Sequence, residues 1–215
     1  MAKKVALVLA GSGVYDGSEI HEAVVCILNL QRLGAEISFF APDVEQADCV
    51  NHFTGEPELE PRSVLAESAR IARGKIAPLS EFDAEKFDAI VFPGGFGAAK
   101  NLCTFAFDGA DCAVNADVNA AIKAMLALGK PQAFLCIAPV VAAKAIGGGV
   151  ELTIGNDVST AAAIEKMGAV HIRCQPDAFV EDEKLRVFST PAYMLAESVA
   201  EIDRGVGAMF KKMLA

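Results

Sequence analysis

The chain has 215 residues and a formal net charge of −9, with 53% hydrophobic and 22% charged residues. A chain of this length and apolar content can bury a substantial core without a disulfide or metal staple. The acidic balance argues against broad binding to nucleic acid or to anionic membranes, since both require a surplus of Lys and Arg. No apolar stretch approaches the length of a membrane span.

The cysteines and the N-terminal residues bear on the compartment. The 6 cysteines include no C-x-x-C pair, and none has a histidine at zinc-ligand spacing, so they indicate a reducing compartment and no metal site. Lys3 and Lys4 precede the apolar run 5–10, which superficially copies a signal peptide but is short and fits a first strand equally well. We therefore expect a cytoplasmic protein, or one in an organelle whose targeting segment is absent from this chain.

Strand and helix patterns alternate along nearly the whole chain. The continuous apolar run 5–10 is typical of a buried parallel strand, and apolar residues at helical spacing predict a helix at 19–33 that stops at Gly34. Similar patterns predict, in chain order, strands at 37–41 and 88–92, a helix at 114–128, a strand at 132–136 that runs into a helix at 137–144, a helix at 158–167, short strands at 170–174, 179–180 and 185–189, and a closing helix at 193–214.

This alternation predicts an α/β fold, with an open, mostly parallel sheet between two layers of helices. The strands at 179–180 and 185–189 are expected to pair around a charged turn. The stretch 46–80 is polar, contains several prolines and has only a modest helix near 62–73. We interpret the chain as a single domain over residues 1–215 with an insertion at about 46–80.

Cys136 stands where a short apolar strand runs directly into a helix. A nucleophile on such a tight turn projects from the backbone, and the N-terminus of the following helix favours the reactive thiolate. The elbow pattern asks for small residues two positions to either side, which Ala138 satisfies and Phe134 does not. The alternative is that Cys136 is a buried cysteine of an apolar strand.

Two further loops leave predicted strand ends with unusual chemistry. The loop at 11–22 fails the dinucleotide fingerprint because Asp16 stands where the third glycine belongs, and it is not a P-loop. It does carry Glu19 and Glu22, which lie near one another in the first helical turn and could equally compensate the helix dipole. Gly94 and Gly95 follow the strand at 88–92, and their free N–H groups suit an oxyanion hole as well as a tight turn.

A thiol, a carboxylate and a glycine pair at three strand ends of one sheet together indicate a cysteine-based site, because ligands bind at that edge. No histidine immediately follows Cys136. His171 is more typical of a structural residue in a short strand. His21, which shares the acidic loop, and His52, in the stretch 46–80, are both candidates to line the pocket. Gly94 and Glu19 are further candidates to line the pocket.

Six segments read together like one known family. They are Gly-Val-Tyr-Asp-Gly-Ser-Glu-Ile-His-Glu (13–22), Asn-His-Phe-Thr-Gly-Glu (51–56), Pro-Gly-Gly-Phe-Gly-Ala-Ala-Lys-Asn-Leu (93–102), Cys-Ile-Ala-Pro (136–139), Leu-Thr-Ile-Gly (152–155) and Thr-Pro-Ala-Tyr-Met (190–194). The chain resembles the amidotransferase-like superfamily that includes the PfpI/ThiJ proteins and the parkinsonism-linked deglycase family. Within it, the chain is most similar to the ElbB glyoxalase family, also described as isoprenoid-biosynthesis proteins with an amidotransferase-like domain.

The resemblance implies a three-layer, doubly wound sheet of the flavodoxin-like, class I glutamine amidotransferase-like type. It implies that Cys136 is the nucleophile and that Glu22 is the carboxylate hydrogen-bonded to it. The backbone N–H groups of Gly95 and Ile137 would form the oxyanion hole. The chain departs from the protease and glutaminase branches, which place a histidine after the cysteine or in a triad with it, and this puts those two activities in doubt.

The resemblance further implies a cofactor-independent glyoxalase that converts glyoxal, or a similar small 2-oxoaldehyde, to the hydroxy acid. Cys136 would form a hemithioacetal with the aldehyde, and Glu22 would move a proton between the two carbons. A homodimer is also implied. The competing hypothesis is a redox-sensing or chaperone-like protein linked to isoprenoid metabolism, in which Cys136 is oxidised and catalysis is weak.

Overall fold

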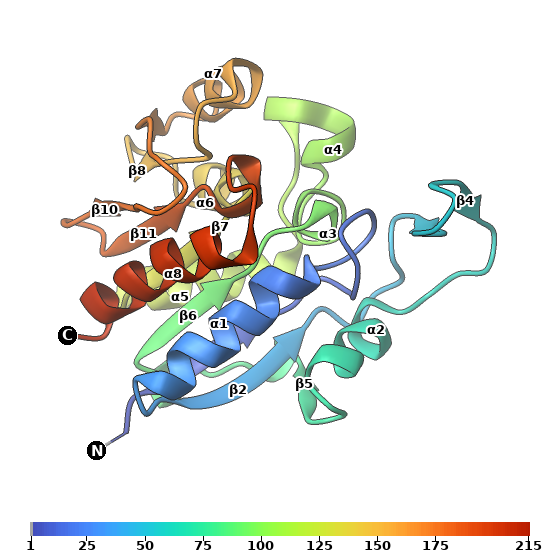
Figure 1. The fold of residues 1–215 in the computed structure, drawn as a ribbon, viewed down its shortest axis with the longest axis horizontal. Helices are drawn as coiled ribbons and strands as arrows, with labels where there is room; N and C mark the ends of the chain where they lie inside the picture. Colours follow the sequence, from blue (N-terminus) through green and yellow to red (C-terminus); the bar gives the residue numbers. More distant parts are fainter. Residues whose placement is uncertain (1) are drawn as a thin grey trace.

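The chain folds as a twisted sheet between two layers of helices (Figure 1). The computed structural model describes residues 2–215. Within these residues, no helix has both the length and the apolar character needed to cross a bilayer. The predicted three-layer α/β fold is confirmed.

The main sheet has seven strands in the order β10-β11-β7-β6-β1-β2-β5. All neighbours are parallel except β10 and β11, which form the antiparallel pair expected from the sequence. Two small two-stranded sheets, β3-β4 and β8-β9, lie outside it. The strands are β1 (Lys4–Val8), β2 (Glu36–Ala41), β3 (Cys49–Val50), β4 (Pro57–Glu58), β5 (Ile76–Pro78), β6 (Ala89–Phe92), β7 (Gln132–Leu135), β8 (Glu151–Leu152), β9 (Val170–His171), β10 (Val180–Asp182) and β11 (Val187–Thr190).

The helices connect these strands and cover the sheet. The α-helices are α1 (Ile20–Arg32), α2 (Val64–Ile71), α3 (Phe96–Lys100), α4 (Phe105–Asp108), α5 (Ala116–Ala127), α6 (Pro139–Ile146), α7 (Val158–Lys166) and α8 (Val199–Met213). Four short 3-10 helices are η1 (Leu79–Glu81), η2 (Ala84–Lys86), η3 (Gly109–Asp111) and η4 (Ala192–Met194).

Each face of the sheet has its own apolar core, because side chains alternate between the two faces along a strand. Leu7, Val91 and Leu135 pack with α1 and α8 on one face. Phe92 and Phe134 pack with α5 and α6 on the other face, where their rings stack with centroids 4.8 Å apart. The central strands therefore consist of continuous apolar residues, which explains why their positions could be predicted from the sequence.

The strand order reverses between β1 and β6. After β1 the chain builds β2 and β5 on one side, and it then crosses to β6 and β7 on the other side. Ligand sites of doubly wound sheets lie at the carboxyl ends of the strands that flank such a reversal. In this chain Gly94 and Cys136 directly follow β6 and β7, and Glu22 lies in the first turn of α1, after the loop that follows β1.

Two predicted elements differ from the structure. The expected closing helix at 193–214 is divided into η4 and α8, because Ser198 begins a new helix and accepts a hydrogen bond from the N–H of Glu201. The strand expected at 170–174 is shortened to β9, which pairs with β8 in a separate small sheet.

The stretch 46–80 contains the β3–β4 hairpin, which projects from the body in Figure 1, and the expected helix as α2. It also contains β5, which pairs with β2 at the edge of the main sheet, so its last residues belong to the central layer. The interpretation of one domain with an insertion stays a prediction.

Candidate active site

Cys136 occupies a strained turn between β7 and α6. Its φ is 59°, in the left-handed region that residues with a Cβ seldom adopt. The turn is held from below, since the N–H of Cys136 donates to the carbonyl oxygen of Thr190 at 3.0 Å. Phe134, which breaks the small-residue pattern, lies in the core against Phe92 and leaves the turn intact.

Glu22 is completely buried and lies beside the Cys136 thiol. Its Oε2 accepts a hydrogen bond from the N–H of Gly94 at 2.9 Å, and its Oε1 accepts one from the N–H of Tyr193 at 3.1 Å. Burial raises the pKa of Glu22 to about 7, although these N–H groups act in the opposite direction. A carboxyl group with this pKa exchanges protons readily at neutral pH.

The pKa of the Cys136 thiol is also raised, well above its usual range. Burial is the main cause and the negative charge of Glu22 adds to it, while the N–H groups of Gly95 and Ile137 lower the pKa. The sequence predicted a thiolate favoured by the helix N-terminus, and this expectation was wrong. The helix end is outweighed because the sulfur is shielded from water and faces a carboxylate.

Gly94 and Gly95 allow the loop after β6 to approach the other two loops. A methyl group added at Gly94 would lie 2.3 Å from the Cβ of Cys136 and 2.6 Å from Oε2 of Glu22. At Gly95, where φ is 95°, an added Cβ would lie 2.3 Å from the N of Glu19. Both positions therefore exclude a side chain, and the glycines bring the thiol and the carboxylate together.

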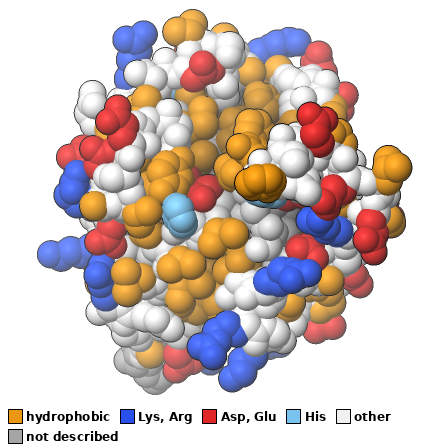
Figure 2. Space-filling model, turned by 45° about the vertical axis from the view of Figure 1, so that its right-hand side comes forward, with side chains coloured by type: hydrophobic (Ala, Val, Ile, Leu, Met, Phe, Trp, Pro, Cys, Tyr) orange, Lys and Arg blue, Asp and Glu red, His pale blue; other side chains and the backbone are white. Residues whose placement is uncertain are grey.

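A cavity of about 670 Å³ opens over the thiol. Figure 2 shows a hollowed face on which hydrophobic side chains surround a histidine and acidic groups. Apart from Cys136, Gly95 and Ile137, its apolar walls come from Val14, Phe96, Ala99, Phe105, Ala106 and Met194. Its polar groups come from Glu19, His21, Asp157, Thr160 and Tyr193.

Glu19 and His21 both line this cavity. Glu19 caps α1, since its Oε2 accepts a hydrogen bond from the N–H of Glu22 at 2.6 Å. Nδ1 of His21 lies 2.8 Å from the hydroxyl of Tyr193 and 3.9 Å from Oε1 of Glu19. The two acidic residues of the loop thus have different environments, one capping a helix and the other buried against the sulfur.

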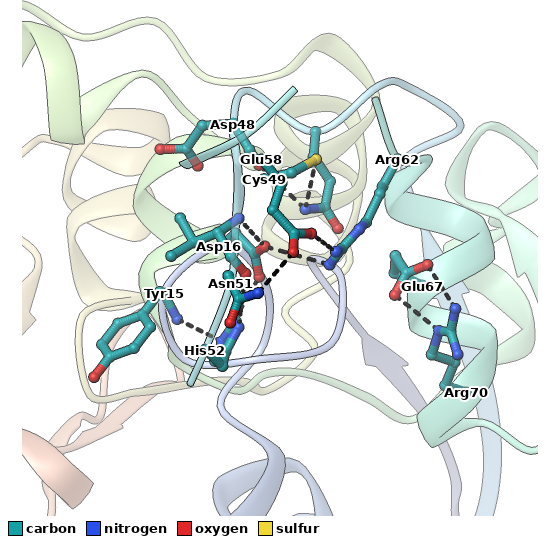
Figure 3. A network of polar contacts seen from close by, with 12 residues as sticks. Tyr15, Asp16, Asp48, Cys49, Asn51, His52, Glu58, Arg62, Glu67 and Arg70 are labelled. Carbon is teal, nitrogen blue, oxygen red and sulfur yellow. Dashed lines mark hydrogen bonds and ion pairs between the residues drawn. The ribbon is translucent and has the colours of Figure 1, made fainter. Parts of the chain in front are cut away.

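His52, a candidate to line the pocket, lies in a different polar network (Figure 3). Its Nε2 accepts a hydrogen bond from the N–H of Tyr15 at 3.2 Å, and its ring stacks on that of Tyr15. Beside it, the buried Asp16 accepts from the N–H of Val50 at 2.8 Å and faces Arg62. This network joins the β3–β4 hairpin to the loop after β1, so His52 orders that loop from outside the cavity.

Several cavity residues, above all Tyr193 and Phe105, were not predicted from the sequence. Tyr193 lies in η4, just after β11, and its backbone holds Glu22 while its side chain lines the cavity. Its place after a strand end was the available signal, but the predicted continuous helix from 193 concealed the turn. Phe105 lies in α4, which the sequence pattern did not predict.

No known protein-family model matches the chain. The chain is 50% identical to the mitochondrial ES1 protein homolog of Rattus norvegicus, over 98% of this chain and 83% of the relative. It is also 50% identical to the mitochondrial glutamine amidotransferase-like class 1 domain-containing protein 3 of Homo sapiens, over 99% of this chain and 83% of the relative. The chain belongs to the ES1 family of class 1 glutamine amidotransferase-like proteins.

Solved structures agree with this assignment. The crystal structure of an isoprenoid biosynthesis protein with amidotransferase-like domain from Ehrlichia chaffeensis is 36% identical to this ES1-family chain, with a TM-score of 0.91 over 98% of each chain. DJ-1beta of Drosophila melanogaster, at 20% identity and a TM-score of 0.52, shares the fold alone. The resemblance to the amidotransferase-like superfamily is confirmed at this level.

The names of the relatives correct the expected location. Both of these ES1-family relatives, and a third from Danio rerio that is 34% identical, are named as mitochondrial proteins. The expectation of a cytoplasmic protein is therefore contradicted. It rested on scattered cysteines, which indicate a reducing compartment but do not distinguish the cytoplasm from the mitochondrial interior.

Proposed function

We propose that this protein is a cofactor-independent, glutathione-independent glyoxalase of the ElbB type, which converts a small 2-oxoaldehyde such as glyoxal to its hydroxy acid. The observation that carries the proposal is the buried pair of Cys136 and Glu22 at the cavity wall, with the N–H groups of Gly95 and Ile137 facing the sulfur. The site thus brings together a nucleophile, a base of pKa about 7 and two backbone donors.

The first step follows from the protonation of the pair. The thiol carries the proton at rest, and Glu22 accepts it as the sulfur attacks one aldehyde carbon. The new C–S bond converts the carbonyl oxygen to an oxyanion, which the N–H groups of Gly95 and Ile137 stabilise. The raised pKa of the thiol therefore does not prevent attack, because its proton is removed within the same step.

The second step moves hydrogen between the two carbons. Glu22 first passes the thiol proton to the oxyanion, which gives the neutral hemithioacetal. The carboxylate then removes the proton from the carbon bonded to sulfur, which gives an enediolate, and returns it to the neighbouring carbon, while the hydroxyl proton passes to the second oxygen. The first carbon becomes a thioester and the second an alcohol, so one is oxidised as the other is reduced. Water then cleaves the thioester and releases the hydroxy acid, glycolate in the case of glyoxal, and the thiol of Cys136 is restored.

The competing redox-sensor hypothesis is less well supported. A sensor cysteine needs an accessible thiolate, whereas Cys136 is 8% exposed and its pKa is raised.

A glutaminase function is also less well supported. In a glutaminase triad, a histidine would contact the thiol. In residues 2–215, no histidine is among the groups that shift the pKa of Cys136.

The test is turnover of glyoxal by wild-type protein, Cys136→Ala and Glu22→Gln, with glycolate measured in the absence of glutathione and added metal. We expect turnover by the wild type, and a loss of at least about 10²-fold in each variant because each removes one half of the pair. Circular dichroism of each variant controls for folding. Glycolate formation by the Cys136→Ala protein at the wild-type rate would refute the mechanism.

We also propose that the protein forms a homodimer, as the family resemblance implies. Sedimentation velocity at micromolar concentration tests this, and a single species of 22.5 kDa would contradict it.

A further inference from the structure

We infer that the preferred substrates are neutral 2-oxoaldehydes that carry an apolar substituent of about the size of a phenyl ring, selected by Phe96 and Phe105. This inference rests on the proposed function and specifies its substrate class. Three features of the cavity carry it, namely its volume, the apolar residues of its lining and the sign of its charges.

The cavity is much larger than glyoxal requires. Its volume of about 670 Å³ lies within the range of about 300–1,000 Å³ that is typical of pockets for drug-sized ligands. Glyoxal consists of two joined carbonyl groups. The sulfur would bond to one carbonyl carbon, and Glu22 would transfer a proton to the other. A substrate of that size would leave most of the cavity filled with water, so the remaining volume is available to a substituent.

Much of the cavity lining is apolar. Phe105 is half-buried in α4 and Phe96 is 50% exposed at the start of α3, and both line the cavity. Met194 contributes a flexible thioether from η4, which also carries Tyr193. A ring placed against these side chains buries apolar surface on both partners, which favours binding.

The charges of the lining disfavour an anionic substituent. Glu19 and Asp157 contribute carboxylates, and the cavity lining described in residues 2–215 includes no Lys or Arg. The cation of Lys100 lies 5.7 Å from the ring centroid of Phe96. It is bound to Asp48 at 2.7 Å and to the carbonyl oxygen of Tyr15 at 2.9 Å, so it is already compensated.

The experiment compares initial rates of the wild-type protein on glyoxal, phenylglyoxal and 4-carboxyphenylglyoxal, with Cys136→Ala as the blank. Phenylglyoxal and its carboxylated form have the same reacting group and nearly the same shape, so their ratio isolates the charge. We expect kcat/KM for phenylglyoxal to exceed that for glyoxal and that for 4-carboxyphenylglyoxal by at least about tenfold each.

A pair of variants distinguishes the effect of the cavity wall on kcat/KM from the intrinsic reactivity of the aldehydes. Phe105→Ala removes a wall residue, whereas Phe107→Ala removes a ring of the same helix that is 58% exposed and does not line the cavity. We expect Phe105→Ala to lower the phenylglyoxal-to-glyoxal ratio of kcat/KM by at least about fivefold and Phe107→Ala to leave it unchanged. Phe105→Leu, which keeps an apolar wall, should retain most of the ratio, and serves if the alanine variant unfolds.

The outcomes are distinguishable. Cys136-dependent turnover of glyoxal at a kcat/KM equal to or above that for phenylglyoxal would overturn the inference and leave the proposed function standing. Equal turnover of phenylglyoxal and its carboxylated form would overturn the neutral-substrate part in the same way. If none of the three aldehydes is turned over, the proposed function fails and the inference fails with it.

Discussion

At Gly94, a hydrogen atom stands where any other residue would place a carbon atom between the thiol and the carboxylate. The N–H of the same residue donates to Oε2 of Glu22. Gly94 therefore orients the carboxylate and also leaves room for the sulfur. Three residues from three segments, each following a different strand, thus make one arrangement. Displacement of any of them changes the distance over which a proton must move.

Gly94→Ala should therefore reduce glyoxalase turnover by about 10²-fold or more, since a displacement of about 1 Å at reacting groups has effects of this size. The matched control is Gly207→Ala in α8, where the added carbon meets chiefly the end of the Asn29 side chain. Turnover by the Gly94→Ala protein within about threefold of the Gly207→Ala control would show that the close approach is not needed for the reaction.

The burial of Glu22 makes the stability of the fold depend on pH. An unfolded chain releases this proton near the ordinary value of 4.5, whereas the folded protein holds it to about 7. Between these values the folded state binds more protons, so its stability falls as the pH rises. The effect is about 3 kcal/mol, since one pKa unit corresponds to about 1.4 kcal/mol.

Urea unfolding of the wild type and of Glu22→Gln between pH 4 and 9 measures this dependence. The free energy of unfolding of the wild type, relative to that of the glutamine variant, should decrease as the pH rises through about 7 and then level off. Glutamine does not titrate, and all other titratable groups are present in both proteins. The difference between their free energies of unfolding therefore isolates the contribution of Glu22. A difference that stays constant over this pH range would contradict the raised pKa of Glu22.

At the scale of elements, a break in the chain separates η4 from α8. Tyr193 lies in η4, before the break, and its N–H donates to Oε1 of Glu22 at 3.1 Å. Ser198 begins α8 after the break, since its side chain caps this helix by accepting from the N–H of Glu201 at 3.3 Å.

Ser198→Ala should lower the free energy of unfolding by about 1 kcal/mol, the usual value of an N-cap. Ser198→Asp is the control, because aspartate caps as well as serine and also suits the positive end of the helix dipole. Chemical denaturation of the two variants checks the prediction. Equal stability of the alanine and aspartate variants would mean that the cap does not set the start of α8.

At the scale of the whole molecule, the two apolar cores on the faces of the sheet fix the strands whose ends carry the site. Phe134 belongs to the core under α5 and α6, where it stacks on Phe92 and is fully buried. It is two residues before Cys136, so the strand that ends at the nucleophile is anchored by this ring.

Phe134→Ala should destabilise the fold by about 3–5 kcal/mol, because it removes a fully buried ring and leaves a cavity. Phe134→Leu keeps most of the volume and should cost less than half as much. Thermal and urea unfolding measure both variants. A loss of less than about 1 kcal/mol for the alanine variant would place Phe134 outside the core, as a distorted elbow would require.

The amino-acid sequence by itself determined the elements that are continuous and apolar. The strands β1, β6 and β7 could be predicted because a strand buried on both faces must be apolar throughout, and α1 and α5 because their spacing is helical. Those elements place Glu22, Gly94 and Cys136 at three strand ends, and this was sufficient to choose the candidate site.

Tertiary structure alone decided the state and the surroundings of these residues. The sequence predicted a thiolate at Cys136, since a helix N-terminus is a local feature that can be recognised in the sequence. The protonated thiol results from burial and from a carboxylate distant in the chain, and neither is visible in the residues around position 136. The packing of distant segments also decided which other side chains reach the cavity. Tyr193 and Phe105 line it and His52 does not, and no local pattern encodes which side chains meet at the edge of a sheet.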